Sequence, residues 1–122
     1  MVKVLVVDDS SMMCLLLRRI LVARGYQVIE ARDGATAVRH YESERPDAVV
    51  LDLNLEDISG IEVLERLRQI DGAPRVILAS ATSAETEATV RARCQAAGAR
   101  AFLNKPFAAE QVAGAIAAVL AA

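Results

Sequence analysis

The chain has 122 residues, the usual length of one domain with a single core. Hydrophobic residues make up 54% of it, yet it has two Phe, two Tyr and no Trp. We therefore expect an aliphatic core, and the composition argues against base stacking on nucleic acid. A net charge of -2 likewise gives no electrostatic footprint for nucleic acid or an anionic membrane, so proteins or small ions are the expected partners.

Targeting, membrane and zinc-binding signals are weak. The first apolar stretch stops at Asp8, Arg18 and Arg19 interrupt the next, and neither approaches the roughly 20 residues of a membrane span. Cys14 and Cys94 lie far apart without metal-ligand spacing, so we expect small core residues. These features favour a cytoplasmic protein.

Short apolar runs alternate with segments of helical apolar spacing, which is typical of repeated βα units. The expected strands are residues 3–7, 27–31, 48–51, 75–79 and 101–103. Five helices are expected. The first starts near residue 10 or 11 and ends at Gly25, the next three cover residues 35–43, 61–69 and 84–97, and the last begins just after Pro106. Because the strands are continuously apolar, we predict an α/β fold: a doubly wound parallel sheet in one domain, residues 1–122.

Two helices carry specific expectations. The first should bury five residues in one stripe: Met13, Leu16, Leu17, Ile20 and Leu21. The last has no polar side chain beyond Gln111, which places four small residues on its outer face: Gly114, Ala115, Ala118 and Ala121. Either the helix propensity of alanine explains this face, or it is a docking surface, including one for a homodimer.

Polar side chains stand at or just after the ends of four predicted strands. They are Asp8 and Asp9, then Asp52, Ser80 and Lys105. Because the carboxyl ends of parallel strands share one edge of a sheet, and ligands of such sheets bind there, we expect these five groups to converge.

Three clustered carboxylates require a counter-charge, since two charges about 4 Å apart repel by roughly 4 kcal/mol at an effective dielectric near 20. Ligation by Asp9, Asp52 and a carbonyl oxygen suits Mg²⁺ or Mn²⁺. Asp52 is the best candidate for a nucleophile that attacks phosphorus. Ser80 and Lys105 would bind oxygens of the phosphoryl group.

Four segments carry a family resemblance. They are Val4 to Ser10 with its acidic pair, Val49 to Asn54 followed by Gly60, Leu78 to Ala81, and Gly98 to Phe107. With them, essentially the whole chain resembles a response-regulator receiver domain of bacterial two-component signalling. The resemblance implies a flavodoxin-like fold of strand order 2-1-3-4-5, with five flanking helices.

The resemblance also implies roles for single residues. A histidine kinase or phosphotransfer protein would donate a phosphoryl group to Asp52. Mg²⁺ would be held by Asp9, Asp52 and the main-chain carbonyl of Asn54, with Asp8 supporting through water. Lys105-Pro106 would be a cis bond.

Switching, and the absence of ordinary enzyme turnover, are implied in the same way. Ser80 would be drawn toward the phosphoryl group and Phe102 would rotate inward. The face built by the fourth helix, fifth strand and fifth helix would then bind its output protein differently. Catalysis would be limited to Mg²⁺-dependent self-phosphorylation and self-dephosphorylation at Asp52.

The sequence departs from the family pattern at two places. Leu55-Glu56 replace the usual Met-Pro, and Glu56 either affects phosphoryl transfer through its charge or points into water. Ser80 to Phe102 spans 22 positions, more than the family usually shows, so we expect a longer fourth helix or preceding loop.

Two other functions stay open. A metal-dependent phosphohydrolase with an aspartyl-phosphate is disfavoured because Asn54 stands where such enzymes commonly need a second Asp. A flavodoxin-like cofactor binder is disfavoured because the turn at residues 8–11 is acidic rather than glycine-rich.

Overall fold

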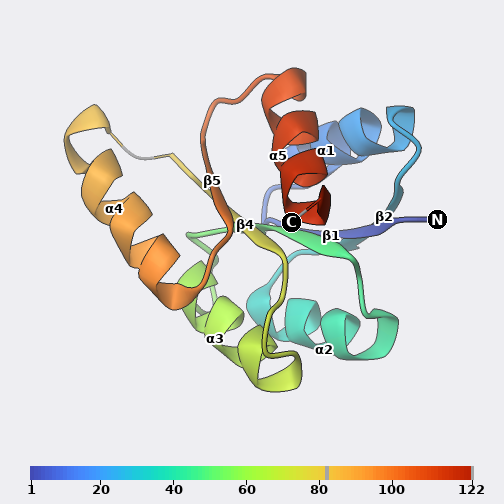
Figure 1. Ribbon diagram of the computed structural model, residues 1–122, viewed down its shortest axis with the longest axis horizontal. Helices are drawn as coiled ribbons and strands as arrows, with labels where there is room; N and C mark the ends of the chain where they lie inside the picture. The colour runs from blue at the N-terminus through green and yellow to red at the C-terminus, as the bar shows by residue number, and fades with distance from the viewer. Residues whose placement is uncertain (82, 122) are drawn as a thin grey trace.

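Five parallel strands form one sheet, and helices cover both of its faces (Figure 1). The computed structural model describes residues 1–81 and 83–121. The strand order is β2-β1-β3-β4-β5, which confirms the expected fold class and topology. The elements in chain order are β1 (Lys3–Val7), α1 (Ser11–Ala23), β2 (Gln27–Ala31), α2 (Gly34–Glu44), β3 (Ala48–Asp52), α3 (Gly60–Ile70), β4 (Val76–Ser80), α4 (Ala84–Ala97), β5 (Ala101–Asn104) and α5 (Ala109–Ala121).

The sheet separates two aliphatic cores. Successive strand residues point to opposite faces, so neighbours such as Val4 and Leu5 belong to different cores although both are fully buried. One core lies under α1 and α5, and the other under α2, α3 and α4. Figure 1 shows α1 and α5 together on one side of the sheet, with α2 and α3 on the other. This two-sided burial explains the continuous apolarity of the strands.

Local signals set the helix ends. The Ser10 side chain accepts a hydrogen bond from the Met13 N–H and caps α1, which agrees with the expected helix start near residue 10 or 11. Gly98 ends α4 with a φ of 105°, a left-handed conformation that glycine adopts without strain. α4 therefore has its expected bounds, and the other elements except α5 differ from expectation by at most two residues at either end.

Two expectations about α1 and α5 were wrong. Leu16 is 44% exposed, because the buried stripe of α1 centres on Cys14, Leu17 and Leu21. α5 begins at Ala109 rather than just after Pro106, because the Gln111 side chain accepts a hydrogen bond from the Ala108 N–H and closes the first turn there.

The structure also tests the expectations for the two cysteines and for the outer face of α5. Cys14 and Cys94 are buried and unbridged. On α5, Gly114, Ala118 and Ala121 are exposed, but Ala115 is partly buried and packs against the core. Within residues 1–81 and 83–121, no helix has the length and apolarity needed to cross a membrane.

The burial of the core predicts how much a truncated core side chain destabilises the fold. Leu5 is fully buried at the centre of the sheet, so Leu5→Ala should lower the free energy of unfolding by about 2–5 kcal/mol through lost burial and a residual cavity. Leu15→Ala, at a position that is 44% exposed on α1, is the matched control and should cost less than about 1 kcal/mol. Urea unfolding of both variants measures the difference. Equal losses would contradict this description of the core.

Candidate functional site

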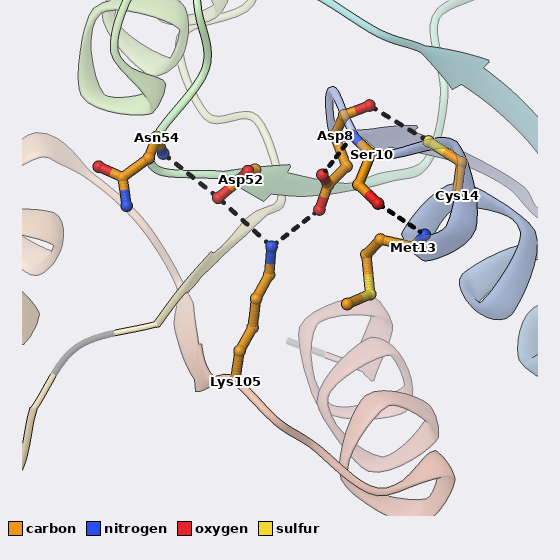
Figure 2. A network of polar contacts seen from close by, with 7 residues as sticks. All are labelled: Asp8, Ser10, Met13, Cys14, Asp52, Asn54 and Lys105. Carbon is orange, nitrogen blue, oxygen red and sulfur yellow. Dashed lines mark hydrogen bonds and ion pairs between the residues drawn. The ribbon is translucent and has the colours of Figure 1, made fainter.

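The polar residues predicted at strand ends do share one edge of the sheet. In the pairing register, Val7 lies opposite Leu51, Asp52 opposite Ala79 and Ser80 opposite Asn104, so the adjacent strands β1, β3, β4 and β5 end at the same edge. Asp8, Asp52 and Lys105 follow or end three of these strands. Figure 2 shows the Lys105 amine pointing between the carboxylates of Asp8 and Asp52.

Three carboxylates form the acidic part of the site. One oxygen from each of Asp8, Asp9 and Asp52 lies within 4.8 Å of the others. Asp8 and Asp52 are buried, at 2% and 7% exposure, whereas Asp9 is exposed and leaves the cluster open to solvent. An oxygen-only donor set with an open side is what a hard divalent cation requires. The three residues therefore fit a metal ion.

Lys105 directly follows β5, and its side-chain amine reaches the acidic cluster. Its Nζ lies 2.9 Å from Asp8 Oδ2 and 3.6 Å from Asp52 Oδ1. One ammonium against three carboxylates leaves two negative charges without a partner inside the cluster, which favours a bound cation. The Lys105-Pro106 bond is cis, as the family resemblance implies.

Burial and charge act in opposite directions on the two central groups. Burial raises the pKa of Asp52 above its ordinary value, the positive charge of Lys105 opposes this rise, and the charges of Asp8 and Asp9 add to it. Burial alone would lower the pKa of Lys105, but the hydrogen bond to Asp8 and the charge of Asp52 outweigh it and raise that pKa. Lys105 therefore stays charged, while ionised Asp52 is held at some cost.

Hydrogen bonds from three other residues hold Asp8 in place. Its Oδ1 accepts a hydrogen bond from the Ser10 N–H at 2.9 Å, and its Oδ2 accepts one from Lys105. The Cys14 thiol donates to the Asp8 carbonyl at 3.3 Å. Cys14 was predicted only as a core residue, and no spacing rule indicates this second contact. With both oxygens engaged, Asp8 is suited to hold Lys105 and support the site.

The backbone around Asp52 is equally constrained. The Asn54 N–H donates to Asp52 Oδ1 at 3.2 Å. A Cβ at Gly60 would lie 2.5 Å from the Asp52 carbonyl oxygen and 2.8 Å from the Leu53 Cα, so only glycine lets α3 begin against this strand end. That contact explains the glycine eight residues after the aspartate. Glu56, the unusual residue of this loop, is exposed to solvent.

Ser80 and Phe102 lie in the adjacent strands β4 and β5, in different surroundings. Ser80 is fully buried, and its Oγ has no hydrogen-bond partner within residues 1–81 and 83–121. Phe102 is only partly buried, and the Arg91 guanidinium of α4 lies over its ring, 5.0 Å from the centroid. A buried hydroxyl without a partner is costly and is a ready donor for an incoming oxygen. Helical spacing gave no indication of the Arg91 contact.

Known proteins are similar to this chain in sequence and in architecture. Residues 4–117 match the family model described as the response regulator receiver domain. The chain is 36% identical over 115 residues to the chemotaxis protein CheY of Bacillus subtilis (strain 168), and the match covers 93% of each. It is 44% identical over 107 residues to the transcriptional regulatory protein KdpE of Mycobacterium tuberculosis, covering 88% of this chain but only 46% of that regulator.

Solved structures of response regulators have the same fold as this chain. A putative response regulator from Chloroflexus aurantiacus J-10-fl superposes with a TM-score of 0.91 at 26% identity, covering 98% of both chains. The crystal structure of the CheX-CheY-BeF3-Mg+2 complex from Borrelia burgdorferi matches with a TM-score of 0.90 at 30% identity, covering 97% of this chain and 88% of that one.

The raised pKa of Asp52 predicts a stability effect. Because the folded state holds this carboxyl at a raised pKa, its ionisation destabilises the fold above that pKa and not below the unfolded pKa. Asp52→Asn should therefore raise the free energy of unfolding at pH 7 without metal, and the gain should shrink as the pH falls through the raised pKa.

The matched control is Glu65→Gln, which makes the same carboxylate-to-amide change on the exposed face of α3. It should change the unfolding free energy by less than about 0.5 kcal/mol both at pH 7 and at lower pH. Urea unfolding of both variants, with a chelator present, measures this. A destabilised Asp52→Asn variant at pH 7 would contradict the electrostatic description.

Proposed function

The chain belongs to the response regulator receiver domain family, and on that basis we propose that it is a signalling switch whose phosphoacceptor is Asp52. The single observation that supports this most is the placement of Asp52, a buried carboxylate 3.6 Å from the Lys105 amine with two more carboxylates close by. That combination suits the acceptance of a phosphoryl group better than the permanent binding of a small molecule.

The cluster also supports a metal site. In the proposal, Asp9, Asp52 and the main-chain carbonyl of Asn54 hold Mg²⁺ or Mn²⁺, and Asp8 supports the ion through water. The bound ion would shield the negative charge of the incoming phosphoryl group and orient its oxygens. The tethering of both Asp8 oxygens to Ser10 and Lys105 favours this division of roles over direct ligation by Asp8.

The same geometry supports phosphoryl transfer to Asp52. A carboxylate oxygen of Asp52 forms a bond to phosphorus while the phosphorus–nitrogen bond of a phosphohistidine donor breaks, and the electron pair stays on the imidazole nitrogen. Lys105, which binds Asp8 in the structure, would then be shared with a phosphoryl oxygen. The donor would be a histidine kinase or a phosphotransfer protein, and turnover would be limited to self-phosphorylation and self-dephosphorylation.

Switching would use the two residues beside the site. A phosphoryl group carries about -1.5 to -2 charges at neutral pH and offers an acceptor to the unpartnered hydroxyl of Ser80. Movement of that hydroxyl would open space for Phe102, which lies under Arg91 of α4. The face of α4, β5 and α5 would then bind an output protein or a second copy of the chain differently. On α5, Gly114 and Ala118 are exposed.

Beryllofluoride, an analogue of the phosphoryl group, provides the test. With Mg²⁺, it should shift the amide NMR signals of residues 8–9, 52–54 and 80, and also those of α4 and β5. Asp52→Asn should abolish every beryllofluoride-dependent shift, because the anchoring carboxylate is gone.

A second variant separates binding from switching. Ser80→Ala should keep the shifts around Asp52 but lose most of those in α4 and β5, because it removes only the hydroxyl. The proposed function fails if wild-type protein shows no shift, or if Asp52→Asn shows the same shifts as wild type.

A further inference from the structure

The loop that joins β3 to α3, residues 53–59, follows directly after Asp52 and contains Asn54. Two backbone hydrogen bonds fix its ends. The Leu53 N–H donates to the Ala79 carbonyl of β4 at 2.8 Å, and the Gly60 N–H donates to the Leu53 carbonyl at 2.8 Å. Residues 54–58 lie between these ties, outside any helix or strand. Their conformation determines where the Asn54 carbonyl points.

Asp57 connects this loop to a different helix. Its Oδ1 accepts a hydrogen bond from the Gly34 N–H at 2.9 Å, and its Oδ2 accepts one from the Ala35 N–H at 3.1 Å. Both donors belong to the first turn of α2 and lie more than 20 positions earlier in the chain. The two-oxygen contact therefore fastens the middle of the loop to the start of α2.

The chemistry of a helix start explains why this contact holds. The first N–H groups of a helix have no partner within it and carry a partial positive charge, so a carboxylate is the preferred acceptor. The Gly34 N–H in turn lowers the pKa of Asp57, which therefore stays ionised. α2 has its own local cap as well, because Asp33 Oδ1 accepts from the Thr36 N–H at 2.7 Å. Asp57 thus adds a connection that the helix start does not need for its ordinary cap.

Packing at Gly34 supports the same contact independently. A Cβ on Gly34 would come within 2.5 Å of Ile58 Cγ1 and 2.9 Å of Val63 Cγ2. The residue after Asp57 therefore packs directly on the first residue of α2, which is buried. Loop and helix start fit together only because Gly34 has no side chain.

Resting on the proposed function, we propose that Asp57 is a positioning residue for the metal and phosphoryl site. By holding the middle of the loop against α2, Asp57 limits the conformations of residues 54–58, and with them the position of the Asn54 carbonyl that the proposed function makes a metal ligand. Loss of a residue that orients a metal ligand typically weakens metal affinity by 10 to 100-fold. Because Asp57 acts through the backbone rather than on the ligand side chain, we expect the lower end of that range.

Three variants separate positioning from helix stability. Asp57→Ala removes both contacts to α2, and Asp57→Asn keeps one acceptor oxygen. Asp33→Ala removes a cap of the same helix without touching the loop. The dissociation constant for Mg²⁺, from amide NMR titration, and the thermal unfolding midpoint are measured for each.

Asp57→Ala and Asp33→Ala should lower the unfolding midpoint to a similar extent. Only Asp57→Ala should raise the Mg²⁺ dissociation constant, by about tenfold, and Asp57→Asn should fall between it and wild type. Unchanged affinity in Asp57→Ala, or an equal loss in Asp33→Ala, would overturn the inference alone. If Asp57→Ala does not fold, wild-type affinity in Asp57→Asn overturns it. Absence of Mg²⁺ binding by the wild type would overturn the proposed function as well.

Discussion

The structure depends on one constraint, the placement of three carboxylates and one amine at a single edge of an otherwise apolar sheet. The Lys105 amine binds Asp8 at 2.9 Å and approaches Asp52 at 3.6 Å, which neutralises only part of the acidic charge. The strands behind these groups are buried on both faces and hold the strand ends in register. Rigid strands with unbalanced charge at their ends favour a bound cation and, after it, an anionic group.

Much of this architecture was predictable from the sequence, for identifiable reasons. Continuous apolar runs indicate a doubly covered parallel sheet, and polar residues at the ends of such runs must meet at one edge, so Asp8, Asp52 and Lys105 could be placed together. Spacing does not fix side-chain direction. The exposure of Leu16, and the closer contact of Lys105 with Asp8, depend on side-chain and helix orientations that spacing leaves undetermined.

Contacts between distant segments were also beyond sequence reasoning. The bonds from Asp57 to the start of α2, and the stacking of Arg91 over Phe102, join residues whose spacing matches no local motif. Neither contact involves a group of the charged centre. The destabilised carboxyl of Asp52 and the unpartnered hydroxyl of Ser80 show a site whose groups are held ready for a ligand rather than satisfied by the fold.

The most direct test of this electrostatic arrangement is the pKa of the Asp52 carboxyl, followed by ¹³C NMR with and without Mg²⁺. Without metal, the pKa should lie above the ordinary aspartate value of about 3.9, because of burial and the neighbouring carboxylates. Mg²⁺ should lower it, because a bound cation stabilises the ionised carboxylate. An ordinary pKa that Mg²⁺ leaves unchanged would contradict the central claim that unbalanced buried charge makes this edge of the sheet a binding site.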